Sequence, residues 1–505
     1  MRRARADKRT AGSSIAAMIA MITVAAMLSG CAAQSLKLAP PDPNHPWSAS
    51  QDANSASLRS EAQESGELSL SAPEIDANRT YNLPELIDLA QRSNPTTRAA
   101  WESARQAALA VGMAEATYLP FITANAIGGT GTNTSPLPIP IGADSYFSTN
   151  IDGVAPFIAL QWLAFDFGGR SAVISAAQQL SLAANYKFNA AHQQLIFQVT
   201  GAWHQYNAAR NHTKVAVQSL ANARTLLDAV TEKRKNGLAT SVDLAQAEQL
   251  VAQGEFRVVK ARGDESDAYQ TLLGAIGISP ASRLKIADSS GQPLPSSVTT
   301  PVKTMIDIAL ARRPDILAGY AAVKASQSGV DATKAAFMPK IGIYGSLATY
   351  SADATVGGLP TANASGVNGN IFVGISIPLY DGGMREANMK QAESREAAAS
   401  RDFEHLKDTA AREIVMASNA LTSAIASHNA AVKMSAAAAK TYDSTLEAYR
   451  NGVGTVTAAA AAQTDLLNAR LAEGDARESA FAAAANLAFV LGSSMSGPDG
   501  QPANP

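Results

Sequence analysis

The chain has 505 residues, of which 46% are hydrophobic and 17% charged, and its formal net charge at pH 7 is −2. A mildly acidic chain lacks the basic surface of nucleic-acid-binding proteins, so no nucleic-acid partner is expected. The single cysteine can form no internal disulfide, and none of the six histidines belongs to a closely spaced metal-ligand pair. No catalytic motif stands out either, so we predict that the protein is not an enzyme and carries no cofactor.

The N-terminus has the features of a secretory signal peptide. A basic segment at 2–9 precedes an apolar run at 15–28, which is shorter than the roughly 20 residues of a membrane helix. The run ends in Leu28-Ser29-Gly30-Cys31, which has the form of a bacterial lipobox. We therefore expect a lipoprotein signal peptide at 1–30 and lipidation of Cys31. An ordinary signal peptide that contains a cysteine is the alternative.

Two segments have the composition of chain that does not fold alone. Residues 31–75 are rich in Pro, Ser, Ala and Asn, and the last residues, 493–505, are similar. Such segments bury too little apolar surface to offset the entropy lost on ordering. The first is expected to be a lipidated flexible tether and the second a disordered tail.

The region between these segments contains one unit twice. The first copy is expected at 76–278 and the second at 302–492, with a Pro-rich connector at 279–301. The matching segments are Ile87-Asp88-Leu89-Ala90 with Ile306-Asp307-Ile308-Ala309, Asn94-Pro95 with Arg313-Pro314, Phe165–Arg170 with Tyr380–Arg385, Lys235-Asn236-Gly237 with Arg450-Asn451-Gly452, and Leu273-Gly274 with Leu491-Gly492. Their unchanged order and nearly constant spacing indicate an internal duplication.

Each copy is expected to contain two strands after a first helix. The strands are placed at about 121–134 and 153–165, and at about 340–350 and 371–380. In the last of these, the β-branched residues Ile371, Val373 and Ile375 alternate with Phe372, Gly374 and Ser376. A period of two over about ten residues suits a tilted transmembrane strand. It suits a soluble antiparallel sheet with one wet face equally well.

A long helical hairpin follows the strands in each copy. The hairpins are expected at about 169–273 and 384–490, with turns at Asn236-Gly237 and Asn451-Gly452, and no proline interrupts them. Outgoing helices of about 65 residues would reach on the order of 100 Å. A coiled-coil stalk in a non-conducting structural lipoprotein of the cell envelope would explain the helices. It would leave the strands without a role.

Four strands in a membrane would leave two edges of unpaired backbone groups in hydrocarbon, which is prohibitive. Several chains must therefore contribute to one barrel, and three chains would supply twelve strands. The expected fold is mainly α with membrane β. It is a trimeric 12-stranded β-barrel that continues into a 12-helix periplasmic α-barrel.

Residues 80–492 resemble the TolC-like outer-membrane factors. The resemblance rests on the duplication, on Tyr118-Leu119-Pro120 and Phe337-Met338-Pro339 before the strands, on Pro378–Gly383, and on the hairpin tips. It implies an outer-membrane exit duct of a tripartite efflux pump or a type I secretion system. The duct would be a homotrimer that conducts substrates passively, with a periplasmic adaptor (membrane fusion) protein and an inner-membrane transporter as partners. It would lie in the outer membrane, anchored to its lipid, with a large periplasmic portion.

The resemblance also assigns roles at the hairpin tips. The adaptor would contact Arg234, Lys235, Asn236, Gly237, Leu238, Arg450, Asn451, Gly452, Val453, Gly454 and Thr455. Simple turn formation with solvated charge is the alternative for these residues. Asp243 and Tyr449 match two positions of the family's gate latch. Gly454 stands where the family has an arginine, and Ala458 and Ala461 stand where it has acidic residues at the aperture. These departures leave the gate and the cation selectivity open.

Overall fold

The computed structural model describes residues 40, 42–45, 76, 78–141, 144–289, 291–295, 300–355, 360 and 362–493. The expected signal peptide, the lipidation site at Cys31 and the expected tail after residue 493 lie outside the described residues. The described chain divides into two units, a strand unit at 105–182 and 321–401 and a helical unit made of the remainder. Within the described parts, no helix combines the length and apolarity needed to cross a membrane.

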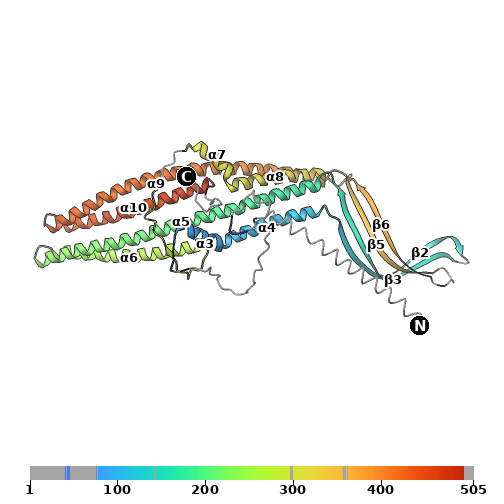
Figure 1. Cartoon of the computed structure of the whole chain (residues 1–505), viewed down its shortest axis with the longest axis horizontal. Coiled ribbons are helices and arrows are strands. Elements are labelled where there is room, and N and C mark those ends of the chain that lie inside the picture. Colours follow the sequence, from blue (N-terminus) through green and yellow to red (C-terminus); the bar gives the residue numbers. More distant parts are fainter. Residues whose placement is uncertain are drawn as a thin grey trace, which may run out of the picture. The chain divides into compact units, whose positions relative to one another are not determined.

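The strand unit is built around one four-stranded sheet (Figure 1). Its strands, in spatial order, are β2 (Phe121–Ile141), β3 (Asp144–Phe165), β5 (Lys340–Thr355) and β6 (Ala362–Ser376). Every neighbouring pair is antiparallel. The sheet leaves β2 and β6 as edge strands, so each has one row of backbone groups without a partner in the sheet.

The strands are longer than the sequence pattern predicted. The expected strands at 121–134, 153–165 and 340–350 extend to 121–141, 144–165 and 340–355. The fourth, expected at 371–380, begins at Ala362 and ends at Ser376. Its end is set by Pro378, because proline has no N–H to donate to a strand ladder.

Apolar side chains gather on one face of the sheet. Ile343 is paired with Val373 on one side and with Trp162 on the other, and Leu160 is paired with Ile122. The opposite face is more polar and includes the hydrogen bond from Ser346 Oγ to Asn370 Oδ1 at 2.8 Å. Many apolar side chains of the sheet are exposed in the single chain; Val373, for example, is 70% exposed. A contiguous apolar face of this kind needs a cover of lipid or protein.

An aspartate and an arginine stabilise each connection from a strand to a long helix. The Asp166 carboxylate accepts from the backbone N–H of Arg170 at 2.7 Å, and the Arg170 guanidinium lies over the ring of Tyr118. In the second connection the Asp381 carboxylate accepts from Arg385 Nε at 2.6 Å. This bond holds the pKa of Asp381 below its ordinary value. The guanidinium lies 5.2 Å from the ring centre of Phe337.

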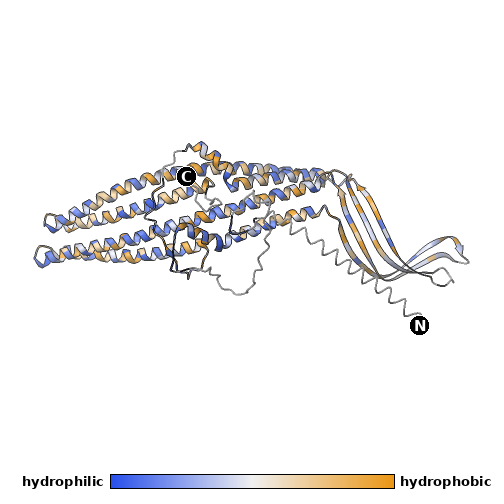
Figure 2. Cartoon of the chain, in the orientation of Figure 1, coloured by the Kyte–Doolittle hydropathy of each residue, from blue (hydrophilic) through white to orange (hydrophobic). Residues whose placement is uncertain are grey.

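The helices are long and mostly uninterrupted (Figure 1). They are α3 (Leu83–Ser93), α4 (Pro95–Ala116), α5 (Gly169–Lys235), α6 (Ser241–Ile276), α7 (Val302–Arg312), α8 (Pro314–Ala335), α9 (Met384–Arg450) and α10 (Val456–Val490). A short strand β1 (Thr80–Tyr81) pairs in parallel with β4 (Lys285–Ile286). Figure 2 shows hydrophobic and hydrophilic residues alternating along the helices, as expected for helices with one packed face.

Two similar cores hold the short helices against the hairpins. In the first, Leu86 of α3 packs with Trp203 of α5 and Leu272 of α6. In the second, Met305 of α7 packs with Ile414 of α9 and Leu487 of α10. These side chains are at most 4% exposed, except Leu487, which is 6% exposed. Burial of such side chains contributes about 1.5–3 kcal/mol each.

The connector and the described part of the expected tether both pack on helices. In the connector, Ser289 Oγ donates to Glu478 Oε1 at 2.6 Å, and His204 Nδ1 lies 2.7 Å from Glu478 Oε2. Nearer the N-terminus, Trp101 Nε1 donates to Pro40 O at 2.7 Å. The described part of the expected tether thus contacts the helical unit through the backbone carbonyls of Pro40 and Pro43. The flexible tether expected over 31–75 stays a prediction.

Candidate functional site

The first hairpin tip is a tight turn between α5 and α6. Gly237 has φ of 71°, a conformation that favours glycine, and Leu238 N donates to Lys233 O at 2.8 Å. Helix α6 then begins with Thr240 as its N-cap, and Thr240 and Asp243 form a reciprocal capping box. Leu238 is 74% exposed at the end of this turn.

The second tip repeats this plan between α9 and α10. Gly452 has φ of 82°, and Val453 N donates to Ala448 O at 3.0 Å. Thr455 caps α10 by accepting from Ala458 N at 3.1 Å. Val453 is 85% exposed. Both tips thus present one exposed apolar side chain beside the turn, Leu238 in the first and Val453 in the second.

Charged residues surround the apolar tip residues. Lys235 pairs with Glu232 and Arg450 with Glu447, in each case along the same helix and in an exposed position. Exposed pairs of this kind contribute little to stability. The side chains of Lys235 and Arg450 are 69% and 48% exposed.

Below the tips, all four hairpin helices share one core. Its buried members include Leu226 of α5, Leu250 of α6, Leu446 and Tyr449 of α9, and Leu466 of α10. Lys233 of α5 reaches across to α9, where its Nζ lies 4.5 Å from the ring centre of Tyr449 and donates to Tyr449 O. The two hairpins therefore contact each other at this end through this shared core, through Lys233 and through other polar contacts such as Thr457 with Gln246.

No hydrogen bond joins the side chains of Asp243 and Tyr449 among the described residues. The Asp243 carboxylate accepts from Thr240 N and Thr240 Oγ1, both at 2.8 Å, and the backbone bond from Thr240 is the main cause of its lowered pKa. The Tyr449 hydroxyl is buried and has no hydrogen-bond partner among the described residues. Burial, followed by the charge of Asp243, raises the pKa of Tyr449. The latch between them stays a prediction.

A comparison of the sequence with protein families gives a match over most of the chain. The sequence profile described as "Outer membrane efflux protein" matches residues 86–278 and 305–493, which together make up most of the chain. The chain belongs to the outer membrane efflux protein family.

Relatives of this outer membrane efflux protein occur in several bacteria. Protein CyaE of Bordetella pertussis is 28% identical over 400 residues, which are 79% of this chain and 81% of CyaE. The outer membrane protein OprJ of Pseudomonas aeruginosa is 28% identical over 255 residues, 49% of this chain and 50% of OprJ. The match to OprJ thus spans about half the length of either protein.

Solved structures show the same fold. A membrane protein from Pseudomonas aeruginosa superimposes with a TM-score of 0.69 at 24% identity, over 81% of this chain and 92% of that protein. The outer membrane protein VceC of Vibrio cholerae superimposes with a TM-score of 0.64 at 19% identity, over 81% of this chain and 96% of VceC.

Gly454, where the resemblance places an arginine of the gate latch, is closely surrounded by backbone atoms. A Cβ added there would lie 2.9 Å from Tyr449 N and 3.0 Å from Ala448 C. Backbone atoms cannot yield as a flexible side chain does. The turn of this outer membrane efflux protein therefore requires glycine, and an arginine at 454 would need a different backbone.

Two residues at this end were not predicted from the sequence. Lys233 lies directly before the expected tip residues 234–238, and its contact with Tyr449 distinguishes it from the neighbouring cations. Asp465 lies on the same exposed face of α10 as Ala458 and Ala461, because residues seven apart return to one side of a helix. The spacing alone could have identified Asp465 as the nearest acidic residue on that face.

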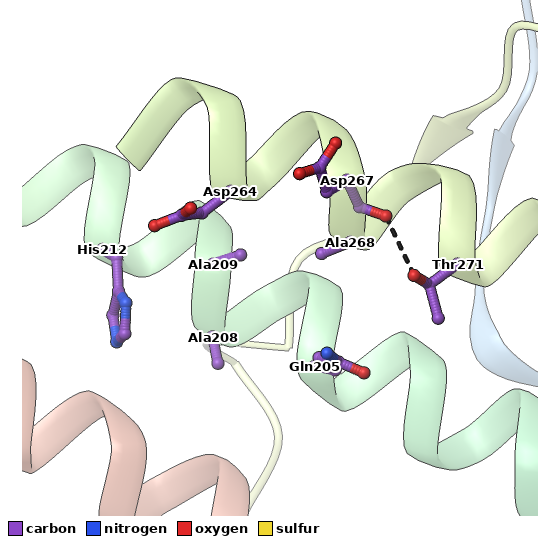
Figure 3. Close-up of a pocket in the computed structure, with 8 residues that line it drawn as sticks. All are labelled: Gln205, Ala208, Ala209, His212, Asp264, Asp267, Ala268 and Thr271. Atoms are coloured by element: carbon purple, nitrogen blue, oxygen red, sulfur yellow. Dashed lines mark hydrogen bonds between the residues drawn. The ribbon is translucent and has the colours of Figure 1, made fainter. Parts of the chain in front are cut away.

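A shallow groove of about 300 Å³ lies between α5 and α6. Figure 3 shows alanines between the helices, with His212 and Gln205 on α5 and Asp264 and Asp267 on α6. His212 Nε2 lies 2.5 Å from Asp475 of α10, and this hydrogen bond raises the pKa of His212. Asp264 pairs with Lys260. Among the described residues, no cluster has the three acidic, histidine or cysteine side chains needed to hold a metal ion.

Proposed function

We propose that this protein is the outer-membrane exit duct of a tripartite efflux pump or a type I secretion system. It acts as a homotrimer, in which three four-stranded sheets close into a 12-stranded β-barrel and the hairpins of three chains form a 12-helix α-barrel. The duct conducts substrates passively and performs no catalytic step.

The main support for this proposal is the four-stranded sheet. It has an exposed apolar face together with two free edges, β2 and β6. An apolar face suits lipid, but free edges in lipid leave N–H and C=O groups without partners. Pairing β6 of one chain with β2 of the next satisfies both edges and lets the more polar face line the lumen.

The internal duplication supports the same proposal. The family profile matches the chain twice, and Asp166 with Arg170 has its counterpart in Asp381 with Arg385. Gly277 and Gly492 end the two hairpins in the same left-handed conformation. Two copies per chain and three chains per duct give six similar units around one axis.

We further propose that Cys31 is lipidated and that the anchor lies in the outer membrane. The exposed tips contact a periplasmic adaptor protein, and an inner-membrane transporter supplies the energy. Leu238 and Val453 provide the apolar contacts, and Arg234, Lys235 and Arg450 provide a positive rim.

The assembly is tested by measuring the mass of the membrane-extracted protein in detergent. Three chains per complex are expected, and a monomer would overturn the proposed duct. The anchor is tested by labelling cells with a radioactive fatty acid. Label is expected on the wild type and not on Cys31→Ser, and label on both proteins would exclude Cys31 as the acylated residue.

A further inference from the structure

A polar cavity of about 300 Å³ lies among α5, α9, α10 and the connector. Its volume is at the lower end of the range for small-molecule sites. Asp288 and Ser289 of the connector form one wall. The connector is held there by Ser289 Oγ, which donates to Glu478 Oε1. Arg477 of α10 also holds it by donating to the carbonyls of Ser289 and Gln292.

Asn207 contributes a buried oxygen atom to this cavity. The residue lies in α5 and is only 4% exposed. Its Nδ2 donates to Trp203 O at 2.9 Å, and this bond orients the amide group. Its Oδ1 has no hydrogen-bond partner among the described residues. A buried acceptor without a partner is costly, so a donor bound in the cavity would stabilise it.

Two opposite charges of α10 also line the cavity. Arg470 and Glu473 are both partly buried, and neither forms a hydrogen bond or a salt bridge in the part of the chain that the structure describes. They lie three residues apart and therefore about one helical turn from each other. By contrast, Lys214 at the same cavity pairs with Asp288 at 2.6 Å. A ligand that carries one positive and one negative charge close together would complement Arg470 and Glu473.

We propose that this cavity binds a free α-amino acid. The carboxylate of the ligand pairs with the Arg470 guanidinium, whose fork of donors matches a carboxylate. The ammonium of the ligand pairs with Glu473 and donates to Asn207 Oδ1. One carbon atom separates the two charges of an α-amino acid, which suits partners one helical turn apart better than the distant ends of a peptide do. The amide of Asn211, which also lines the cavity, favours a polar side chain on the ligand.

The site requires the folded chain and not a conducting duct. It is tested by isothermal titration calorimetry of the purified full-length protein with L-serine and L-glutamine, which carry a short and a longer polar side chain. At least one of them should bind. Its N-acetylated form lacks the ammonium, and its carboxamide lacks the carboxylate. Each derivative should bind about 10-fold or more weakly, as expected for the loss of a charged hydrogen bond.

A variant then locates the site. Arg470→Gln should weaken binding of the amino acid about 10-fold or more, and it should no longer distinguish the amino acid from its carboxamide. The matched control is Arg262→Gln, which removes an exposed arginine of α6. Its affinity for the amino acid should equal that of the wild type.

Three results would contradict the proposed site. If neither amino acid binds to the wild type, the cavity holds water alone and the proposal is wrong. Equal affinities for the amino acid and its two derivatives would show that its charges are not recognised. These two comparisons use the wild type only, so they do not depend on the folding of a variant. Equal affinities of Arg470→Gln and Arg262→Gln would show that the amino acid binds elsewhere.

Discussion

At Tyr449, burial of the ring and the lack of a partner for the hydroxyl have opposite effects on stability. The ring belongs to the core shared by the four hairpin helices and receives the ammonium of Lys233. The hydroxyl is buried without a hydrogen bond among the described residues. An unsatisfied buried hydroxyl costs about 1–3 kcal/mol. The ring therefore explains why an aromatic residue occurs here, and the hydroxyl remains to be explained.

Replacement of Tyr449 by Phe measures what the hydroxyl does. If it has no partner, the free energy of unfolding should stay unchanged or rise by up to about 1 kcal/mol, because the ring and its cation are kept. Denaturant unfolding of the purified assembly is the measurement. A loss of more than about 1 kcal/mol would show that the hydroxyl forms a bond in the assembly, for which Asp243 is the expected acceptor.

His192 acts as a neutral hydrogen-bond donor that holds the N-terminal segment. It is fully buried, its Nε2 lies 3.0 Å from Pro43 O, and its Nδ1 lies 3.5 Å from Gln91 Nε2. The neutral tautomer with the proton on Nε2 fits both neighbours. Desolvation lowers its pKa from 6.5 to about 4.

Stability should therefore fall as the pH drops from about 6.5 to about 4. In this window the unfolded chain binds a proton at His192 that the folded chain does not, which reduces the free energy of unfolding by up to roughly 3 kcal/mol. Unfolding curves recorded across the window should show this slope in the wild type. The slope should be smaller in His192→Asn, which can donate to Pro43 O without titrating. An identical pH dependence in both proteins would contradict the assignment.

The sequence pattern predicted which segments form helices and which form strands better than it predicted the residues at which they begin and end. The distal part of β2, beyond the strand expected at 121–134, contains Pro136, Pro138 and Pro140. Successive N–H groups of a strand point to opposite edges, so prolines at every second residue remove donors from one edge only. The register of β2 against β3 is also irregular between Pro136 and Ile141, so Pro138 and Pro140 lie outside the regular ladder. The pairing partner of β2 could not be known from local composition.

The ends of the two hairpins correct one of the predicted repeat matches. Leu273-Gly274 was paired with Leu491-Gly492, but the glycine that matches Gly492 in conformation is Gly277. Gly274 lies within α6, where its backbone is helical. Glycine in a sequence can mark either a helix interior or a cap, and only the backbone conformation separates the two.

Alanine substitutions should separate these two glycines. A Cβ at Gly277 would lie 2.9 Å from Asn94 Cα, and φ there is 83°, so Gly277→Ala should destabilise the protein by about 1–3 kcal/mol. Gly274 has no atom within 4 Å of its added Cβ. Gly274→Ala should be neutral or stabilise by up to about 1 kcal/mol. Thermal unfolding of both variants is the measurement, and equal effects would contradict the assignment of the cap.

The candidate site was predicted in part. The turn residues were located by their Asn-Gly pairs, because this chemistry is local. The contact of Lys233 with Tyr449 joins residues 216 positions apart, and no local pattern specifies it. The confinement of Asp243 to its own helix cap also depends on the geometry of one turn, where Thr240 competes for the carboxylate.

In the molecule as a whole, the helices and the sheet differ in how far a single chain completes them. Buried cores within one chain, such as those around Leu86, Leu226 and Met305, pack the helices against each other. The sheet is not complete in this sense, since β2 and β6 each lack a neighbour. Association of chains through the sheet therefore explains both its apolar face and its edges.

The proposed duct makes a prediction about ion selectivity. With alanine at 458 and 461, Asp465 is the first acidic residue on this exposed face of α10 counted from the tip. Three copies of it in a trimer would favour cations in a narrow lumen. Asp465→Asn should therefore reduce the cation-to-anion permeability ratio, measured as the reversal potential in a salt gradient. An unchanged reversal potential would show that this face does not line the lumen.

Three copies of the chain should together enclose a conducting path, and a planar-bilayer recording of the purified, lipidated trimer would show whether they do. Discrete conductance steps of small amplitude are expected, because the hairpin tips of the proposed duct would narrow its periplasmic end. A stable trimer that inserts and never conducts, or a monomer without conductance, would contradict the duct and favour a structural lipoprotein with helical stalks.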